Sequence, residues 1–422
     1  MLKTRTMQHP AITDIWFRVV LIFAMSLPML VLYATSTLGP LLGSDLRFGP
    51  ASLGYLVMSS FGVAAVLSLW AGAFVDRIGS RNALIVLFST IASAFTWIAS
   101  VESYYGLIGA TALCGIAQAL ANPVTNLLIA QQVPPAKKAK IVGLKQSGVQ
   151  LAALFAGLVL PGIAFEYGWR TAFAMVVPVA ILFALTAPFV TPKTHPGTGR
   201  GFTFFPPNSF LLRLMGIQFC VGVSLSAFVT FLPTFAIQHG MPLSLAGTLI
   251  AVLGVMGMCS RIVLTPMGAK FKDESLLLLL LIAIAACSMG VMMLTDAENH
   301  WRLWVGAVGV GLTAVGTNAI AMSMLIRDAA FGPVTVASGF VSVAFFGGFA
   351  LGPPFFGAIS NYSGANYSGD PLFGWTALIG VLLSACMMSS ALASARRRAR
   401  ASLMAADAMQ PTNVVAFKRT PE

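Results

Sequence analysis

Charged residues are scarce in this chain. They make up 9% of its 422 residues, whereas hydrophobic residues make up 57%. The mean hydropathy is correspondingly positive, at +0.86. Soluble domains carry roughly 25% charged residues, so this chain has too little charge to cover a globular surface in water. The composition excludes an ordinary soluble protein and predicts a protein whose solvent is largely lipid.

Cysteine and histidine show no pattern that would carry chemistry. The five cysteines fall inside apolar stretches without paired spacing, and the four histidines fall in loops or tails. Such cysteines are typical of small core residues and indicate neither a disulfide framework nor a metal site. No nucleophile–base pair is apparent either. We therefore expect no catalysis, no metal and no cofactor.

What the chain does contain is a series of apolar runs close to the roughly 20 residues that a helix needs to cross a bilayer. An even number of such runs places both ends of the chain on the same side of the membrane. Together they predict an all-α membrane protein with twelve transmembrane helices, at 17–40, 51–73, 82–100, 104–130, 142–164, 171–191, 208–235, 244–265, 275–295, 302–326, 335–358 and 373–394.

The basic residues orient these spans. With the N-terminus inside, only Arg47, Arg170 and Arg302 of the 25 basic residues lie in outside loops, and the other 22 lie at the cytoplasmic face. This asymmetry predicts that both termini are cytoplasmic. The basic runs are scattered over short loops, so nucleic acid is not an expected partner. The short loops favour a bacterial chain, and hence an inner-membrane location.

Acidic residues are absent from the predicted spans, because all thirteen lie in loops, span ends or tails. An exporter that exchanges cationic drugs for protons usually needs a carboxylate inside the membrane. No predicted span contains a histidine that could carry the proton instead of a carboxylate. The charge distribution therefore argues against a cationic substrate.

One charged loop stands between two of the apolar runs. It reads Gly72-Ala-Phe-Val-Asp76-Arg77-Ile-Gly79-Ser-Arg81 and resembles the signature loop of the major facilitator superfamily, Gly-x-x-x-Asp-Arg-x-Gly-x-Arg. The resemblance implies a transporter and covers essentially 13–394. Its glycines would let two helix ends approach closely, and its Asp-Arg pair would act as a latch at the membrane boundary. We predict that the five numbered residues of the motif form a gate. They are Gly72, Asp76, Arg77, Gly79 and Arg81.

The chain also repeats itself at an offset of 196 residues. The repeat predicts two six-helix halves with a substrate site at the midplane between them. We assign 1–191 to the N-terminal half with its short cytoplasmic N-terminus, 192–207 to a linker, 208–394 to the C-terminal half and 395–422 to a basic cytoplasmic tail. The matching landmarks are Gly115 with Gly311, Asn122 with Asn318, Gly143 with Gly339, and Gly72-Ala-x-x-Asp76 with Gly268-Ala-x-x-Lys272.

Lys145 differs from the other basic residues because it follows the start of the fifth predicted span. It lies roughly 5–10 Å inside the helix start, where exposure to lipid costs about 3 kcal/mol or more. The charge therefore either faces a cavity or snorkels back to the headgroups. Gln146 and Gln150, one turn apart on nearly the same face, favour the cavity. The segment 143–148 is also similar, over its short length, to one in cyanate-permease-like bacterial members of the superfamily.

A polar stripe crosses the fourth predicted span, which is otherwise apolar. Amides that faced lipid would be unsatisfied, so these residues must face protein or water. They either hold helices together, at about 0.6 kcal/mol per hydrogen bond, or line the substrate cavity. The stripe consists of Gln118, Asn122, Thr125 and Asn126, and Asn318 repeats it in the tenth span. On the resemblance, Tyr33 and Gln218 lie on helices that line the pore.

Arg261 lies near the end of the eighth predicted span. On the resemblance it corresponds to an arginine that often precedes the second signature loop, although Ser260 stands here where glycine is usual. We assign it a structural gating role, with snorkelling as the alternative.

Together these features predict a secondary active transporter of a small anion, most simply an organic carboxylate, with uptake favoured. Lys145 would supply the charge, and any proton would travel with the anion unless exchange drives transport. Eight further residues complete the predicted binding set of nine: Gln118, Asn122, Asn126, Gln146, Gln150 and Asn318 for neutral hydrogen bonds, with Tyr33 and Gln218. We expect a monomer in the lipid bilayer. The alternative is an exporter of neutral or amphipathic compounds, for which the 20 methionines would suit a permissive pocket. A receptor on the same fold is disfavoured by the short tails.

Overall fold

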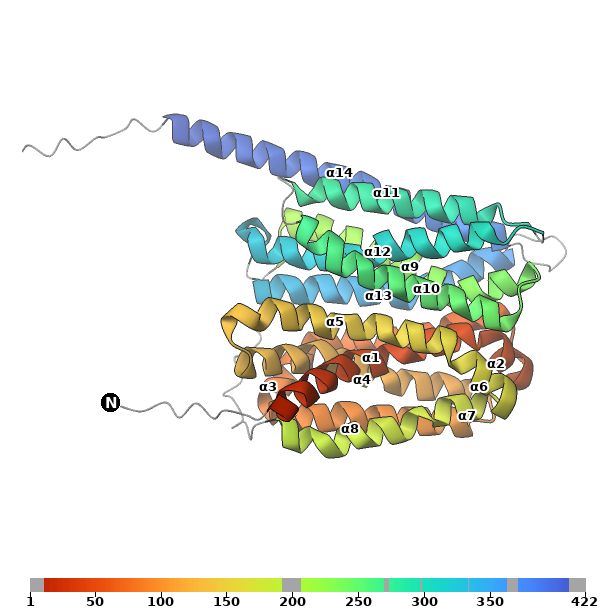
Figure 1. Ribbon diagram of the computed structural model, residues 1–422. Helices are drawn as coiled ribbons and strands as arrows, with labels where there is room; N and C mark the ends of the chain where they lie inside the picture. Colours follow the sequence, from red (N-terminus) through yellow and green to blue (C-terminus); the bar gives the residue numbers. More distant parts are fainter. Residues whose placement is uncertain are drawn as a thin grey trace, which may run out of the picture.

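The computed structural model describes residues 11–191, 206–268, 273–296, 298–332, 334–362 and 371–409. Its helices run side by side in one bundle (Figure 1). The N-terminal half contains α1 (Ala11–Thr37), α2 (Gly39–Leu46), η1 (Pro50–Ser52), α3 (Leu53–Ser100), α4 (Tyr104–Gln132), α5 (Pro135–Leu158), α6 (Leu160–Tyr167), α7 (Trp169–Ala174) and α8 (Val176–Val190). The C-terminal half contains α9 (Ser209–Gln238), α10 (Leu243–Gly268), α11 (Glu274–Met293), α12 (Trp301–Arg327), η2 (Ala329–Phe331), α13 (Val334–Tyr362) and α14 (Pro371–Met409).

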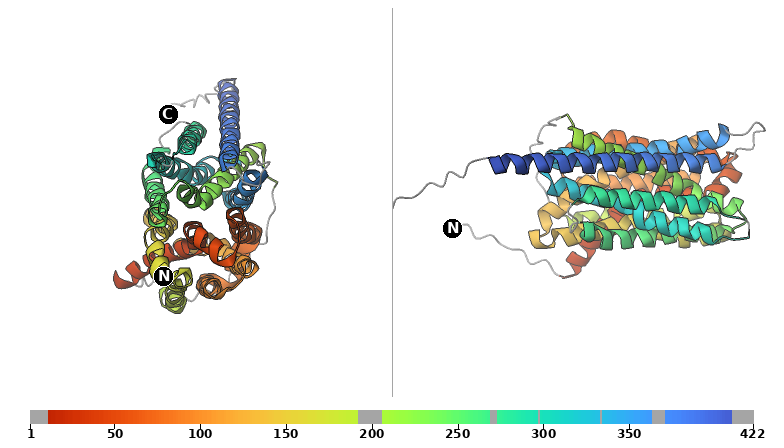
Figure 2. Two further views of the ribbon diagram at one scale, coloured as in Figure 1. Left: turned by 90° about the vertical axis from the view of Figure 1, so that its right-hand side faces the viewer. Right: turned by 90° about the horizontal axis from the view of Figure 1, so that it is seen from above.

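The helices of the described chain form twelve crossings. Eleven helical stretches are long and apolar enough to cross a membrane, and one of them, 50–100, has 51 residues. At 1.5 Å per residue it would be about 77 Å long, more than twice the roughly 30 Å hydrocarbon core, so it crosses twice. In the end-on view of Figure 2 the red-to-yellow and green-to-blue helices form two groups. The predicted all-α fold of twelve transmembrane helices in two six-helix halves is confirmed.

The charged segment between the second and third predicted spans is a break at one residue. The helix of α3 runs through it, and only Gly79 leaves helical geometry, with φ 80° and ψ 157°. This backbone region is almost restricted to glycine. The glycines of the motif were predicted to let two helix ends approach closely, but Gly72 has open space beside it. Gly79 instead provides the break, and its positive φ separates the two crossings.

The two halves pack by the same contacts. In α4, Gly115 lies against the carbonyl of Ser60 in α3, and in α12, Gly311 lies against Met256 in α10. Both pairs are related by the predicted offset of 196 residues, so the repeat extends to helix packing. The repeat of the signature loop falls largely at 269–272, outside the described residues, as does most of the predicted linker.

A row of small residues brings α5 and α10 of opposite halves close together. Gly157 of α5 lies against the backbone of Gly247 in α10, and Gly254 of α10 lies against the carbonyl of Gln150 in α5. A methyl group at these glycines would collide with backbone atoms, and the absence of side chains is what allows such close approach. This glycine seam joins the N-terminal half to the C-terminal half.

Another contact between the halves, α3 against α13, is tightest toward one end of the bundle. In Figure 1 the start of α1 and the end of α14 lie on the left, which we call the termini end, and the other end is the opposite end. Near the opposite end, Gly54 of α3 lies against the backbone of Pro353 in α13. Gly72 lies five turns beyond Gly54 on the same face of α3. It is exposed and has open space beside it, and the same is true of Gly339 in α13. The halves therefore separate here toward the termini end.

Buried ion pairs fasten the C-terminal half at the termini end. Helix α14 continues to Met409, past the predicted boundary at 394, and Arg396 within it is 5% exposed. Its guanidinium pairs with Asp273, before α11, at 3.2 Å and with Asp328, after α12, at 2.7 Å. Three helices of this half are thus tied together by one side chain.

The geometry of Gly79 predicts that Gly79→Ala destabilises the protein. A residue with a side chain in this backbone region costs of order 1–3 kcal/mol. The matched control is Gly72→Ala, at an exposed helical position with open space around it, which should leave stability unchanged or raise it by up to about 1 kcal/mol. Thermal unfolding of both variants in the same detergent checks this, and equal melting temperatures would contradict the assigned role.

Candidate functional site

Lys145 is the buried cation of the N-terminal half. Its side chain is 1% exposed, and its ammonium donates hydrogen bonds to α4 rather than returning to the helix start. The acceptors are Asn126 Oδ1 at 2.6 Å, Thr125 Oγ1 at 2.8 Å and Asn122 Oδ1 at 3.4 Å. Helix α5 begins at Pro135, but its apolar span begins at Ile141, so Lys145 lies about 6 Å inside the span, as predicted.

The three acceptors come from one face of α4, because residues three and four apart on a helix are neighbours. Thr125 was part of the predicted polar stripe but was not assigned to the site. Its position in the sequence could have identified Thr125 as a site residue. It lies three residues after Asn122 and directly before Asn126, so its hydroxyl lies on the same face of α4 as their amides. A lysine ammonium has three N–H donors, and in this arrangement each of them has an acceptor.

Gln146 connects this cluster to the other half. Its Nε2 donates to Asn122 Oδ1 at 3.3 Å. Its side-chain Oε1 and its backbone carbonyl accept hydrogen bonds from Arg261 Nη1, at 3.1 Å and 2.8 Å. A continuous hydrogen-bond network therefore runs from Lys145 through Asn122 and Gln146 to Arg261, and so crosses from α4 and α5 into α10.

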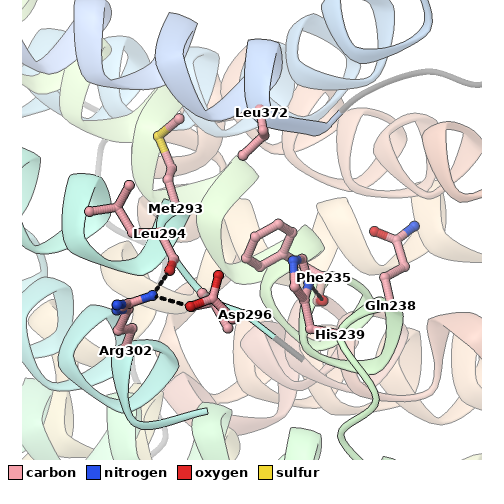
Figure 3. A pocket seen from close by; sticks show the side chains of 9 residues that line it. Phe235, Gln238, His239, Met293, Leu294, Asp296, Arg302 and Leu372 are labelled. Carbon is pink, nitrogen blue, oxygen red and sulfur yellow. Dashed lines mark hydrogen bonds and ion pairs between the residues drawn. The ribbon is translucent and has the colours of Figure 1, made fainter. Parts of the chain in front are cut away.

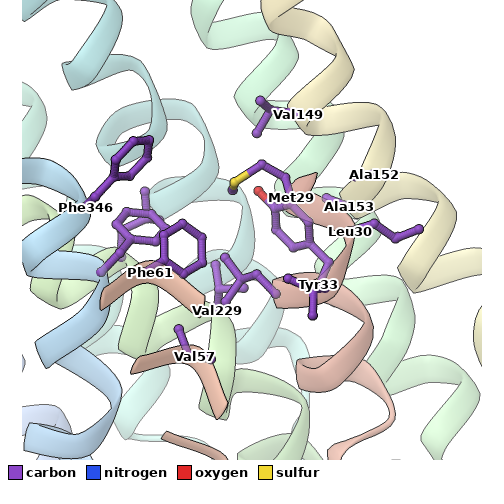
Figure 4. Packing of buried hydrophobic residues seen from close by; sticks show 14 of the residues in the cluster. Met29, Leu30, Tyr33, Val57, Phe61, Val149, Ala152, Ala153, Val229 and Phe346 are labelled. Atoms are coloured by element: carbon purple, nitrogen blue, oxygen red, sulfur yellow. The ribbon is translucent and has the colours of Figure 1, made fainter. Parts of the chain in front are cut away.

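Arg261 is the half-buried cation of the C-terminal half, and it lies at the end of the glycine seam. Neither Arg261 nor Lys145 forms an ion pair with any carboxylate among the described residues. The titratable neighbour of Arg261 is Tyr33 of α1, with which it interacts electrostatically. Figure 4 shows Tyr33 among apolar side chains that include Met29 and Phe61. The network thus borders an apolar cluster between the halves.

The remaining predicted amides are distributed over other contacts. Gln150 lies against Gly257 of α10, one turn from Arg261, and its Oε1 has no hydrogen-bond partner in the described protein. Gln118 Oε1 is likewise buried and unpartnered. Gln218 donates to the Thr317 carbonyl at 3.5 Å, which joins α9 to α12 inside the C-terminal half.

No hydrogen bond in the described residues links Gln118, Gln218 or Asn318 to Lys145. The predicted set of nine binding residues therefore divides. A core formed by Lys145, Asn122, Asn126 and Gln146 reaches Arg261, whereas the other amides lie apart from that core.

The predicted gate residues of α3 are placed at its helix break. Asp76 and Arg77 are exposed and make no ion pair with any described residue, so the structure holds no latch at this position. Arg81 Nη2 donates to the Pro188 carbonyl of α8 at 2.8 Å. Arg261 instead bridges the halves directly, through Gln146.

A separate pocket of about 700 Å³ opens at the opposite end of the C-terminal half (Figure 3). Phe235 of α9, Met293 of α11 and Leu372 of α14 contribute to its lining. Arg302 and Asp296, paired at 2.8 Å, border it as well. It lies within one half and contains none of the predicted site residues, so we do not assign the site to it.

The fold and the network between its halves define the class of protein. Two repeated six-helix halves that meet along buried polar side chains form the architecture of a membrane transporter. Residues 20–353 match the sequence profile of the Major Facilitator Superfamily. This match spans well over half of the chain, and the chain belongs to that superfamily of transporters.

Individual relatives match shorter parts of the chain. It is similar to a hexuronate transporter of Bacillus subtilis (21% identity over 53% of this chain and 57% of the relative) and to a probable chloroplastic anion transporter of Arabidopsis thaliana (30% over 33% and 28%). It also resembles human facilitated glucose transporter member 12 (28% over 33% and 22%). The chain thus matches little more than half the length of these relatives, or less.

The fold has a solved counterpart. The crystal structure of a bacterial homologue of the human lysosomal transporter Spinster, in an inward-facing and occupied conformation, has a TM-score of 0.71. The alignment has 16% identity and covers 91% of this chain and 97% of the other. The same homologue in its unoccupied conformation gives a TM-score of 0.66. At this identity the comparison establishes the shared fold.

A double-mutant cycle between Lys145→Met and Asn126→Leu tests the geometry of the cluster. A hydrogen bond to a charged group is worth about 1.5–3 kcal/mol, so we expect the two substitutions to be non-additive by about 1 kcal/mol or more. The measurement is the free energy of unfolding of the four proteins in mild detergent. Additive effects would mean that the ammonium does not bond to Asn126.

Proposed function

We propose that this transporter carries a small organic carboxylate across a bacterial inner membrane, in the uptake direction, by alternating access. The observation that supports the proposal most is the network between the halves, which contains two cations, Lys145 and Arg261, and only neutral acceptors. A buried charge is costly unless it is paired. An anionic substrate would supply the missing negative charge.

Similarity to other proteins is consistent with this assignment. Two of the relatives are described by their names as a hexuronate transporter and as a probable anion transporter. Hexuronates are carboxylates, so both names denote anionic cargo. The alignments cover 57% and 28% of those relatives, and the carboxylate remains our proposal for this chain.

Alternating access would use the inequality between the α3–α13 contact and the α5–α10 contact. The α3–α13 contact is open toward the termini end, where Gly72 and Gly339 are exposed. With both termini in the cytoplasm, this conformation would face inward. Closing that side would bring α13 toward Asp76 and Arg77, which could then form the latch that the signature motif predicts. The coupled solute would be a proton carried with the anion or an exchanged anion, and the transporting unit a monomer.

A second candidate function is export of neutral or amphipathic compounds. The observation that favours it is the apolar cluster around Tyr33 in Figure 4, which includes Met29, Phe61 and Phe346. Flexible methionine side chains suit a permissive binding surface. The glucose transporter among the relatives also has a neutral cargo by name.

A thermal-shift panel in detergent separates the two functions. Aliphatic and aromatic carboxylates are compared with neutral drugs and lipophilic cations. A ligand at 100 times its Kd should add about 2.7 kcal/mol to the stability of the folded protein, and we expect this effect only from carboxylates. In Lys145→Ala the effect should disappear, because the site loses one of its two charges, whereas Lys137→Ala, an exposed change on the same helix, should preserve it.

Stabilisation by neutral drugs alone, unaffected by Lys145→Ala, would overturn the carboxylate assignment and favour the exporter. The control variant guards against a general effect of removing a lysine from α5.

The orientation is testable with reporter fusions. A fluorescent reporter that folds only in the cytoplasm should be active when fused after Arg400, because the basic residues concentrate at the termini end. A fusion after Arg170, at the start of α7, should be inactive. The reverse pattern would invert the proposed orientation.

A further inference from the structure

Lys145 and Arg261, the two cations of the network, use their hydrogen-bond donors unequally. All three donors of the Lys145 ammonium are taken up by side chains of α4. Arg261 uses only Nη1, for the two oxygens of Gln146. Its Nε is buried without an acceptor, and no described residue accepts a hydrogen bond from its Nη2.

The unused donors of Arg261 lie on one edge of the guanidinium. The Nε–H and one Nη2–H are parallel, and this planar fork matches the two oxygens of a carboxylate. Leaving a buried donor unsatisfied is unfavourable, so the edge is suited to an acceptor that arrives with the substrate. The Nη1 contacts to Gln146 hold the guanidinium in place and keep this edge free.

An unpartnered acceptor lies one helical turn away. Gln150 follows Gln146 by four residues on α5, and Gly257 precedes Arg261 by four residues on α10. Gln150 is 1% exposed, its side chain lies against Gly257, and its Oε1 receives no hydrogen bond. A carbonyl oxygen in this position accepts a hydroxyl donor. Free carboxylate-binding donors and a free hydroxyl acceptor thus occur side by side between the halves, about 5 Å apart along the helices.

We infer that the substrate is a hydroxycarboxylate, whose carboxylate binds the Nε/Nη2 edge of Arg261 and whose hydroxyl donates to Gln150. This rests on the proposed transport of a carboxylate, and it assigns the direct contact to Arg261 rather than to Lys145. Lys145 contributes its charge and holds Asn122, which in turn holds Gln146. Because Arg261 belongs to α10 and Gln150 to α5, one substrate molecule would bind both halves at once.

The test compares two six-carbon carboxylates, gluconate and hexanoate, which differ in their hydroxyl groups. Dissociation constants are obtained by thermal-shift titration of the full-length protein, with size-exclusion profiles confirming that each variant is folded. We expect the wild type to prefer gluconate. Arg261→Lys keeps the charge but loses the fork, and it should weaken gluconate binding about tenfold or more. Arg213→Lys, a matched change on α9, should leave binding unchanged.

A second variant keeps the test decisive if Arg261→Lys does not fold. Gln150→Leu removes the hydroxyl acceptor but not the guanidinium, so it should abolish the preference for gluconate while leaving hexanoate binding within about twofold.

The outcomes separate the two proposals. If no carboxylate stabilises the wild type, the proposed function itself fails. If carboxylates stabilise the wild type but bind Arg261→Lys equally well, or if Gln150→Leu retains the preference for gluconate, this inference is overturned and the proposed function stands.

Discussion

The close approach of α5 and α10 is the contact on which the candidate site depends. Glycines on both helices allow backbone to pack against backbone across the two halves. Only at that separation can Arg261 reach both oxygens of Gln146. Larger side chains along the seam would move α10 outward, and the network from Lys145 to Arg261 would be cut between the halves. The small residues of the seam therefore position the charged ones.

This contact brings together two positive charges that pair with no carboxylate in the described part of the chain. In water, such charges would be solvated, but between packed helices their partners among the described residues are amide, hydroxyl and carbonyl oxygens. Neutral acceptors orient a cation without neutralising it, so the site keeps a positive potential that favours anions. The two cations have different roles in this arrangement, since the donors of Lys145 are all used and an edge of Arg261 is not.

The α3–α13 and α5–α10 contacts between the halves also differ in a way that suits a moving site. The α3–α13 contact is held near the opposite end by Gly54 and Pro353 and opens toward the termini end, whereas the glycine seam of α5 and α10 extends as far as Arg261. A ligand that binds Arg261 and Gln150 together would strengthen the seam. Occupancy and the relative position of the halves would then be coupled, because a ligand shifts a conformational equilibrium by its differential affinity for the two states.

Much of this protein was determined by the sequence alone. The length and apolarity of the spans, the repeat, the helix break at Gly79 and the polar stripe of α4 are local properties, and each predicted its structural counterpart. The partners of Lys145 and Arg261 were decided only by the tertiary structure. Helices in a membrane are apolar on the side that faces lipid and on the side that faces protein, so hydrophobic periodicity does not reveal how each helix is rotated. The contact of Arg261 with Gln146, 115 residues away in the chain, follows from how α5 and α10 pack and has no signature in either segment.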